Sequence, residues 1–158
     1  MLPKTIVGFS ASDNESYRQM LTWRDSEGID FCFRDCSLDA EANWEDEAQI
    51  KAKARRQIGA AKNYVLLIGE DTGYRYQYVS WEAEVAIAQG CTIIGVNLDG
   101  ARQIVESKCL RIISDIGAVF VPFAPRIIAY ALLNFRKRGQ GNWHFPEEVY
   151  RELELTKR

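Results

Sequence analysis

The sequence predicts an α/β fold in which a parallel sheet carries helices on both faces. Short apolar segments alternate along the chain with longer segments of helical period, a pattern typical of βαβ units. The segment 64–68 is apolar throughout, as expected of a strand that is covered on both faces. Five strands are expected, and they favour the flavodoxin-like strand order 2-1-3-4-5.

The first expected strand, 5–9, leads into a helix with a clear start signal. Ser12 and Glu15 have the spacing of a capping box, and Gly28 follows the expected end of this helix. The remaining strands are expected at 29–34, 64–68, 92–96 and 118–121.

The later helices also have recognisable boundaries. In the segment 44–58, with Asn43 as its cap, acidic residues come first and basic residues last, in agreement with the helix dipole. A helix over 78–89 follows the third strand, and Pro125 starts a helix that ends before Gly139.

The length of 158 residues fits a single domain. We expect residues 1–139 to form its body, and 140–158 to be a C-terminal tail with a short polar helix that is part of the same domain. The segment 101–117 is the least regular part and is expected to hold a short helix with irregular flanks.

Charge and hydropathy argue against nucleic acid and membranes as partners. The chain has 20 Lys and Arg against 22 Asp and Glu, a net charge of -2, so it has no basic excess for a duplex or an anionic lipid surface. The most apolar stretch, 117–135, is interrupted by Pro122, Pro125 and Arg126. It therefore reads as a strand followed by a helix, not as a membrane span.

The inventory of metal-binding and nucleophilic side chains is small. The four cysteines form no C-x-x-C pair, and the only histidine is His144, so neither a metal site nor a Cys-His dyad is expected. The cysteines, and a chain start without a charged-then-apolar signal, favour a cytoplasmic location. No P-loop or G-x-G-x-x-G motif is present.

In a doubly wound sheet, ligands bind beyond the carboxyl ends of the strands. The expected strands deliver carboxylates, hydroxyls and one amide to that edge: Ser10, Ser12, Asp13, Asp35, Glu70, Asp71, Asn97 and Asp99.

The helix over 78–89 carries the most informative carboxylate. Glu82 flanks the apolar stripe near the first turn, Tyr78 shares its side one turn earlier, and Glu84 falls on the far, solvated side. The stripe itself comprises Val79, Ala83, Ala86 and Ile87. Two readings stay open from the residues alone: Glu82 reaches the ligand edge, or it merely complements the helix N-terminus, worth about 0.3 to 1 kcal/mol.

These residues carry a family resemblance. The run Tyr78-Val-Ser-Trp-Glu82 and the following segment 86–96 resemble the aromatic-Val-x-x-Glu helix and next strand of TIR-like domains, especially those of the Thoeris antiphage-defence type (ThsB-like). The segments 7–13 and 64–69 are similar to the family's first and third strands, and the resemblance covers about residues 4–100.

The resemblance implies a NAD+ glycohydrolase or cyclase, an enzyme that cleaves the N-glycosidic bond of NAD+ and releases nicotinamide; a cyclase would also convert ADP-ribose into a cyclic signal nucleotide. It assigns the catalytic role to Glu82, and it places Tyr78 where the family usually has a stacking Trp. Phe9, Ser10 and Asp13 map to the family's pocket. Asp35, at the end of the second expected strand, completes the substrate-binding set.

The implied chemistry agrees with the residues available. Loss of nicotinamide builds positive charge on the ribose, which a carboxylate stabilises, and the neutral leaving group needs no general acid. NAD+ is then a substrate and no cofactor is expected. The expected partners are further copies of the chain and a downstream effector reached through a diffusible nucleotide.

Other functions stay open. A nucleoside deoxyribosyltransferase also uses a carboxylate on a flavodoxin-like frame, although the segment 78–82 favours the first reading. TIR-like domains also act as non-enzymatic scaffolds, with the acidic segment 39–47 and the basic segment 136–138 as complementary faces. A phosphoacceptor receiver is the weakest alternative, because Phe123 replaces the usual Lys after the fifth strand.

Overall fold

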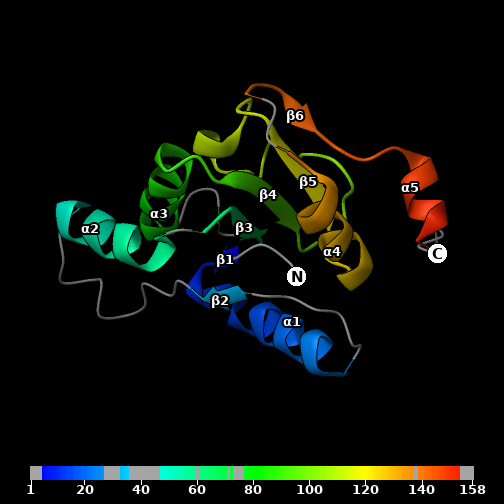
Figure 1. The fold of residues 1–158 in the computed structure, drawn as a ribbon, viewed down its shortest axis with the longest axis horizontal. Helices are drawn as coiled ribbons and strands as arrows, with labels where there is room; N and C mark the ends of the chain where they lie inside the picture. Colours follow the sequence, from blue (N-terminus) through cyan, green and yellow to red (C-terminus); the bar gives the residue numbers. More distant parts are fainter. Residues whose placement is uncertain are drawn as a thin grey trace.

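The structure is a computed structural model that describes residues 5–26, 33–35, 47–59, 61–70, 72, 77–136 and 139–153. The described strands form one sheet in the order β2-β1-β3-β4-β5-β6, in which every neighbouring pair is parallel. The sheet is the centre of the molecule, with helices on both sides of it (Figure 1). The predicted α/β fold is confirmed, and β6 is an additional edge strand that the sequence did not predict.

The strands are β1 (Thr5–Gly8), β2 (Phe33–Asp35), β3 (Asn63–Ile68), β4 (Thr92–Asn97), β5 (Ala118–Pro122) and β6 (Asn142–Trp143). Each of the five predicted strands has a counterpart, although the first part of the second one, 29–32, lies outside the described residues. In the central register, Val65 of β3 pairs with Val7 on one side and with Ile94 on the other.

The helices are α1 (Asn14–Ser26), α2 (Glu47–Ile58), α3 (Gln77–Ala88), α4 (Pro125–Asn134) and α5 (Glu147–Glu152), with 3₁₀ turns at Ala11–Asp13 and Arg111–Ile113. The second turn is the short helix expected within 101–117. The predicted cap Asn43 and the predicted helix start at Trp44 lie outside the described residues.

Two helix boundaries differ from the prediction. The predicted capping box is wrong, because Ser12 belongs to the 3₁₀ turn and its hydroxyl lies 3.1 Å from that of Ser10. The α-helix therefore begins at Asn14. The helix that starts at Pro125 ends at Asn134, earlier than predicted, because the backbone of Phe135 is already extended.

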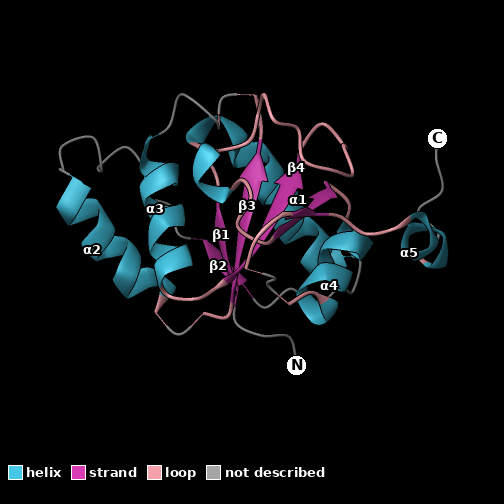
Figure 2. Cartoon of the chain, turned by 90° about the horizontal axis from the view of Figure 1, so that it is seen from above, coloured by secondary structure: helices cyan, strands magenta, loops and turns pink. Residues whose placement is uncertain are grey.

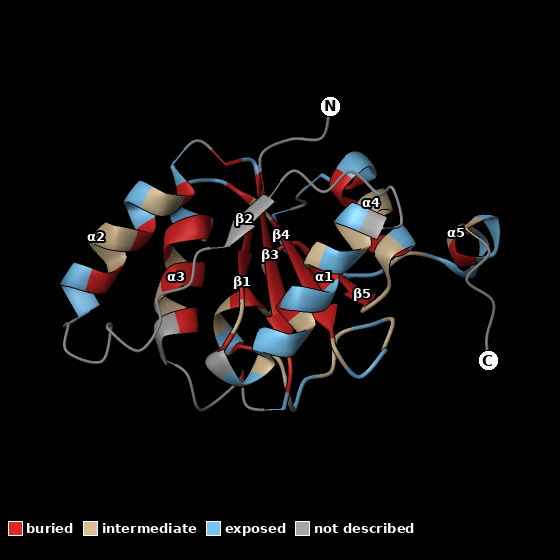
Figure 3. Cartoon of the chain, turned by 90° about the horizontal axis from the view of Figure 1, so that it is seen from below, coloured by how far each residue is buried: buried red, intermediate tan, exposed pale blue. Residues whose placement is uncertain are grey.

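Helices lie in a layer on each side of the sheet (Figure 2). Alternate strand residues face opposite layers. Ile6, Tyr64 and Leu66 are buried in the layer with α2 and α3. Val7 and Val65 are buried in the layer with α1 and α4. Burial on both faces explains why β3 has no polar alternation (Figure 3).

The segment after residue 139 is more than the predicted polar tail. Tyr150 of α5 is 1% exposed. The guanidinium carbon of Arg102 lies over the Tyr150 ring, 4.0 Å from the ring centroid. Phe145 packs edge-on against Tyr130 and Phe135. Burial raises the pKa of Tyr150 to about 12, although nearby Arg102 opposes this shift. The short polar helix expected in this segment is present as α5, in which Tyr150 is the single buried side chain.

In the part of the chain that the structure describes, no helix combines the length and the apolar character needed to cross a bilayer.

Gly95 of β4 is the neighbour of Phe120 on β5 and leaves room for its ring. A Cβ at this position would lie 2.7 Å from two ring carbons of Phe120. We expect Gly95→Ala to lower the free energy of unfolding by about 1–3 kcal/mol in chemical denaturation, because the core cannot expand around the ring. Combined with Phe120→Leu, the loss should be smaller than the sum of the two single losses. Additive losses would contradict the predicted contact.

Candidate functional site

Glu82 lies in the interior, between α3 and the sheet. Glu82 is 3% exposed, and the hydroxyl of Tyr64 on β3 donates a hydrogen bond of 2.6 Å to the Oε1 atom of Glu82. The apolar stripe predicted around it is present, with Val79, Ala83 and Ala86 all buried. The Glu82 side chain is thus directed at the sheet and held there by a polar contact within an otherwise apolar layer.

Gly8, the last residue of β1, passes directly over this pair. A Cβ at Gly8 would collide with the Tyr64 hydroxyl and with Glu82 Oε1, and would lie 2.7 Å from Tyr64 Cζ. Only a residue without a side chain leaves room here, which is a known reason for glycine inside a strand. The carboxylate is therefore adjacent to the carboxyl end of β1, the edge at which the fold class binds ligands.

A second polar group lies at the carboxyl ends of β1 and β3. The Ser10 hydroxyl donates to Asp13 Oδ2 at 3.0 Å, and the Thr72 hydroxyl lies 3.3 Å from the same oxygen. The backbone N–H of Gly69 in turn donates to Thr72 Oγ1 at 2.9 Å. Ser10 and Thr72 are 1% and 0% exposed. These hydrogen bonds therefore connect the β1–α1 turn to the loop after β3 through buried hydroxyl groups.

The Asp13 carboxylate also lies close to the backbone of that loop at Gly69. A Cβ at Gly69 would lie 2.5 and 2.6 Å from the two carboxylate oxygens of Asp13. The structure thus brings two predicted pocket residues, Ser10 and Asp13, into direct contact.

The remaining predicted substrate-binding residues are placed differently. Phe9 is half-buried and stacks on Tyr17 of α1, with ring centroids 4.6 Å apart and planes 13° from parallel. Asp35 is the last residue of β2 and pairs with Val7, at the same edge of the sheet. Tyr78 is in the first turn of α3. The side chains of Asp35 and Tyr78 lie outside the described part of the structure.

Glu84 provides an internal contrast to Glu82 on the same helix. Its side chain is 37% exposed, and Oε2 lies 3.1 Å from the ammonium of Lys51 on α2. Lys51 also pairs with Glu47 at 2.7 Å, so it links the outer surfaces of α2 and α3. The predicted exposure of Glu84 is confirmed, and its contacts are those of a surface ion pair.

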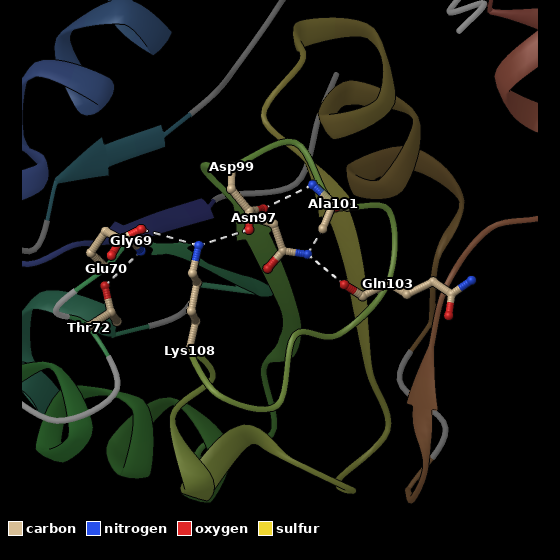
Figure 4. A network of polar contacts seen from close by, with 8 residues as sticks. All are labelled: Gly69, Glu70, Thr72, Asn97, Asp99, Ala101, Gln103 and Lys108. Atoms are coloured by element: carbon tan, nitrogen blue, oxygen red, sulfur yellow. Dashed lines mark hydrogen bonds and ion pairs between the residues drawn. The ribbon is translucent and has the colours of Figure 1, made fainter.

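A third polar group joins the loops that follow β3 and β4 (Figure 4). The ammonium of Lys108 lies 3.0 Å from Asp99 and 3.3 Å from Glu70. The buried Asn97 amide donates to the carbonyls of Ala101 and Gln103 at 3.0 and 2.8 Å. The loop after β4 is therefore held both by Asn97 and by the Lys108 ion pairs.

These contacts change the proton affinities of the ion pair. The backbone N–H of Ala101 and then the ammonium of Lys108 hold the pKa of Asp99 below its ordinary value. Hydrogen bonds to Asp99 and to Glu70 raise the pKa of Lys108.

The described residues offer few alternative catalytic groups. Among them, no cluster of three His, Cys, Asp or Glu side chains is arranged to hold a metal ion. Burial, and to a lesser extent the charge of Glu106, raises the pKa of the Cys109 thiol to about 12. Since the thiolate is the nucleophilic form, this shift disfavours Cys109 as a nucleophile at neutral pH.

Three residues of this region were missed at the level of sequence: Gly8, Tyr64 and Thr72 were treated only as strand or loop positions. Two of them carry a usable signal. A buried tyrosine in an apolar strand needs a partner for its hydroxyl, and a glycine within a strand marks a close approach. Neither signal identifies the partner, which in this case comes from α3.

Thr72→Val tests the hydrogen bonds of the Thr72 hydroxyl with the Gly69 N–H and Asp13. Valine keeps the shape of threonine but leaves the Gly69 N–H without its acceptor, so we expect a loss of about 1–3 kcal/mol in the free energy of unfolding. Thr72→Ser is the matched control and should lose only the value of a methyl group, about 0.8 kcal/mol. Equal losses for the two variants in urea denaturation would contradict the assigned role of the hydroxyl.

Lys108→Met tests the ion pair at the end of β4. Because the folded state holds the pKa of Asp99 down, the pair contributes stability above the unfolded pKa of Asp, about 3.9, and loses it as the pH falls through the folded value. We expect the variant to melt below the wild-type protein at pH 7, with a difference that shrinks below about pH 4. A difference independent of pH would show that only packing had been lost.

A known protein family matches the part of the chain that carries these residues. Residues 7–103, more than half of the chain, match the family model described as Thoeris protein ThsB, TIR-like domain. This range includes Gly8, Asp13, Tyr64, Thr72 and Glu82. No curated protein matches the chain. The chain therefore belongs to the TIR-like domain family of the Thoeris protein ThsB.

Proposed function

We propose that this TIR-like domain is a NAD+ glycohydrolase or cyclase that releases nicotinamide and produces an ADP-ribose-derived, cyclic signal nucleotide in bacterial antiviral defence. The observation that carries the proposal is the buried Glu82 carboxylate, hydrogen-bonded to Tyr64 and adjacent to Gly8 at the end of β1. Family membership supports the defence context.

The proposed reaction breaks the bond between the ribose C1′ and the nicotinamide nitrogen. The bonding electrons leave with nicotinamide, which is thereby neutralised, and positive charge develops on the ribose. The Glu82 carboxylate stabilises that charge. Attack at C1′ by water, with loss of its proton, completes hydrolysis, whereas attack by an atom of the same ADP-ribose completes cyclisation.

The magnitude of this stabilisation is sufficient for catalysis. A unit charge pair about 4 Å apart at an effective dielectric constant near 20 gains about 4 kcal/mol. That energy corresponds to about a thousandfold in rate. The interior position of Glu82 favours such an effect because water, which would screen the charges, is kept out.

Other residues complete the proposed site. Phe9, Ser10 and Asp13 form the wall contributed by the β1–α1 segment, with Ser10 and Asp13 held by their mutual hydrogen bond. Tyr78 and Asp35 are assigned to substrate contacts from the start of α3 and the end of β2. NAD+ is the substrate in this scheme, and the chain acts in the cytoplasm as a self-associating protein whose effector receives a diffusible nucleotide.

Glu82→Gln is the decisive variant. It keeps the shape of the side chain and its capacity to accept the Tyr64 hydrogen bond but removes the charge, so nicotinamide release should fall about a thousandfold with little change in melting temperature. Glu84→Gln is the matched control from the exposed side of the same helix and should retain full activity. Chromatography of NAD+ incubated with concentrated protein measures nicotinamide and every ADP-ribose species.

Three outcomes would contradict the proposal. Full activity of a folded Glu82→Gln variant would remove Glu82 from the mechanism. No nicotinamide from the wild-type protein, even with a crowding agent to promote assembly, would favour a non-enzymatic scaffold. Base exchange in a separate incubation with deoxynucleosides would instead indicate a deoxyribosyltransferase.

A further inference from the structure

We propose that Tyr64 is a positioning residue for the Glu82 carboxylate, so that the two side chains act as one unit in the reaction. The proposal rests on the proposed function of Glu82 and extends it to a residue of the central strand. It follows from three observations: the burial of both groups, the rigidity of the frame that carries Tyr64, and the close approach of Gly8.

Burial makes the contact between the two groups important. Tyr64 is 0% exposed and Glu82 is 3% exposed, so neither side chain has appreciable access to solvent. Buried hydroxyl and carboxyl groups need partners, and a bond to an ionised acceptor is stronger than a neutral one. The separation of 2.6 Å between the Tyr64 hydroxyl and Glu82 Oε1 is in the range of such charge-assisted bonds.

The frame around Tyr64 defines where its hydroxyl can be. β3 is an interior strand, and Tyr64 pairs with Ile6 on β1 and with Ile93 on β4. Its ring is part of the apolar layer against α2 and α3. A glutamate side chain has three rotatable bonds, whereas this ring is held by packing on a paired backbone. The hydrogen bond therefore holds the carboxylate of a helix residue in a position that is set by the sheet.

Gly8 limits the position of the carboxylate from the other side. The space where a Cβ of residue 8 would be is occupied by the Tyr64 hydroxyl and Glu82 Oε1. Phe9 and Ser10, which follow Gly8, belong to the proposed substrate wall. Tyr64 thus fixes the carboxylate relative to the segment that would contact NAD+.

This arrangement predicts an effect on turnover more than on binding. Without the hydroxyl, the Glu82 side chain loses a hydrogen bond that orients it. Misplacement of a catalytic group by about 1 Å costs up to about a hundredfold in rate. The residues assigned to substrate binding are untouched, so KM should change little.

Tyr64→Phe in the full chain tests the proposal, with steady-state nicotinamide release from NAD+ as the assay. We expect kcat to fall about 10- to 100-fold and KM to stay within about twofold. The matched control is Tyr150→Phe. Tyr150 is also buried, but within the described residues its hydroxyl has no hydrogen-bond partner, so this variant should keep the wild-type kcat.

A thermodynamic cycle supplies a readout that does not depend on turnover. Tyr64→Phe, Glu82→Ala and the double variant, compared by thermal unfolding, should show non-additive stability losses if the two side chains depend on each other. The same cycle keeps the proposal testable if Tyr64→Phe alone melts below the assay temperature.

The outcomes separate this proposal from the proposed function. If Glu82→Gln is inactive and a folded Tyr64→Phe keeps its kcat, the positioning role is overturned and the function of Glu82 stands. If Glu82→Gln is fully active, both are overturned. A fall in kcat shared by Tyr150→Phe, or additive losses in the unfolding cycle, would also overturn the positioning role.

Discussion

The hydrogen bond between Tyr64 and Glu82 is the constraint around which the candidate site is built. A carboxylate inside an apolar layer is costly unless it is paired, so its partner, its helix and the strand above it have to fit one another. β3 supplies the hydroxyl, α3 supplies the carboxylate, and Gly8 leaves the space that both occupy. The doubly wound fold provides these three elements side by side.

The carboxyl edge of the sheet is stabilised in two physically different ways. Over β1 and β3, buried hydroxyls of Ser10 and Thr72 converge on Asp13. Over β3 and β4, the partly exposed Lys108 draws Glu70 and Asp99 together. Exposed ion pairs contribute less than buried, fully paired hydrogen bonds and respond more to salt. The loop after β3 takes part in both groups, through Thr72 in the first and Glu70 in the second.

Prediction from sequence was accurate where the periodicity was strong and weaker where an element is short. β3 was predicted within one residue because both of its faces are buried. β6 has two residues, Asn142 and Trp143, too few to show any alternation. The start of α1 was misplaced because Ser12 hydrogen-bonds within the preceding 3₁₀ turn, and local competition of this kind depends on small differences in backbone geometry.

The sequence by itself determined the order of the first five strands and of the helices between them, the family and the helix that carries Glu82, because these depend on patterns along the chain. Only the tertiary structure decided what Glu82 contacts. Tyr64 is 18 positions earlier, and Thr72 is 59 positions from Asp13. Periodicity specifies which face of an element is buried, but the side chain across the core depends on how neighbouring elements pack. For that reason the pairing of Tyr64 with Glu82 is visible only in the tertiary structure.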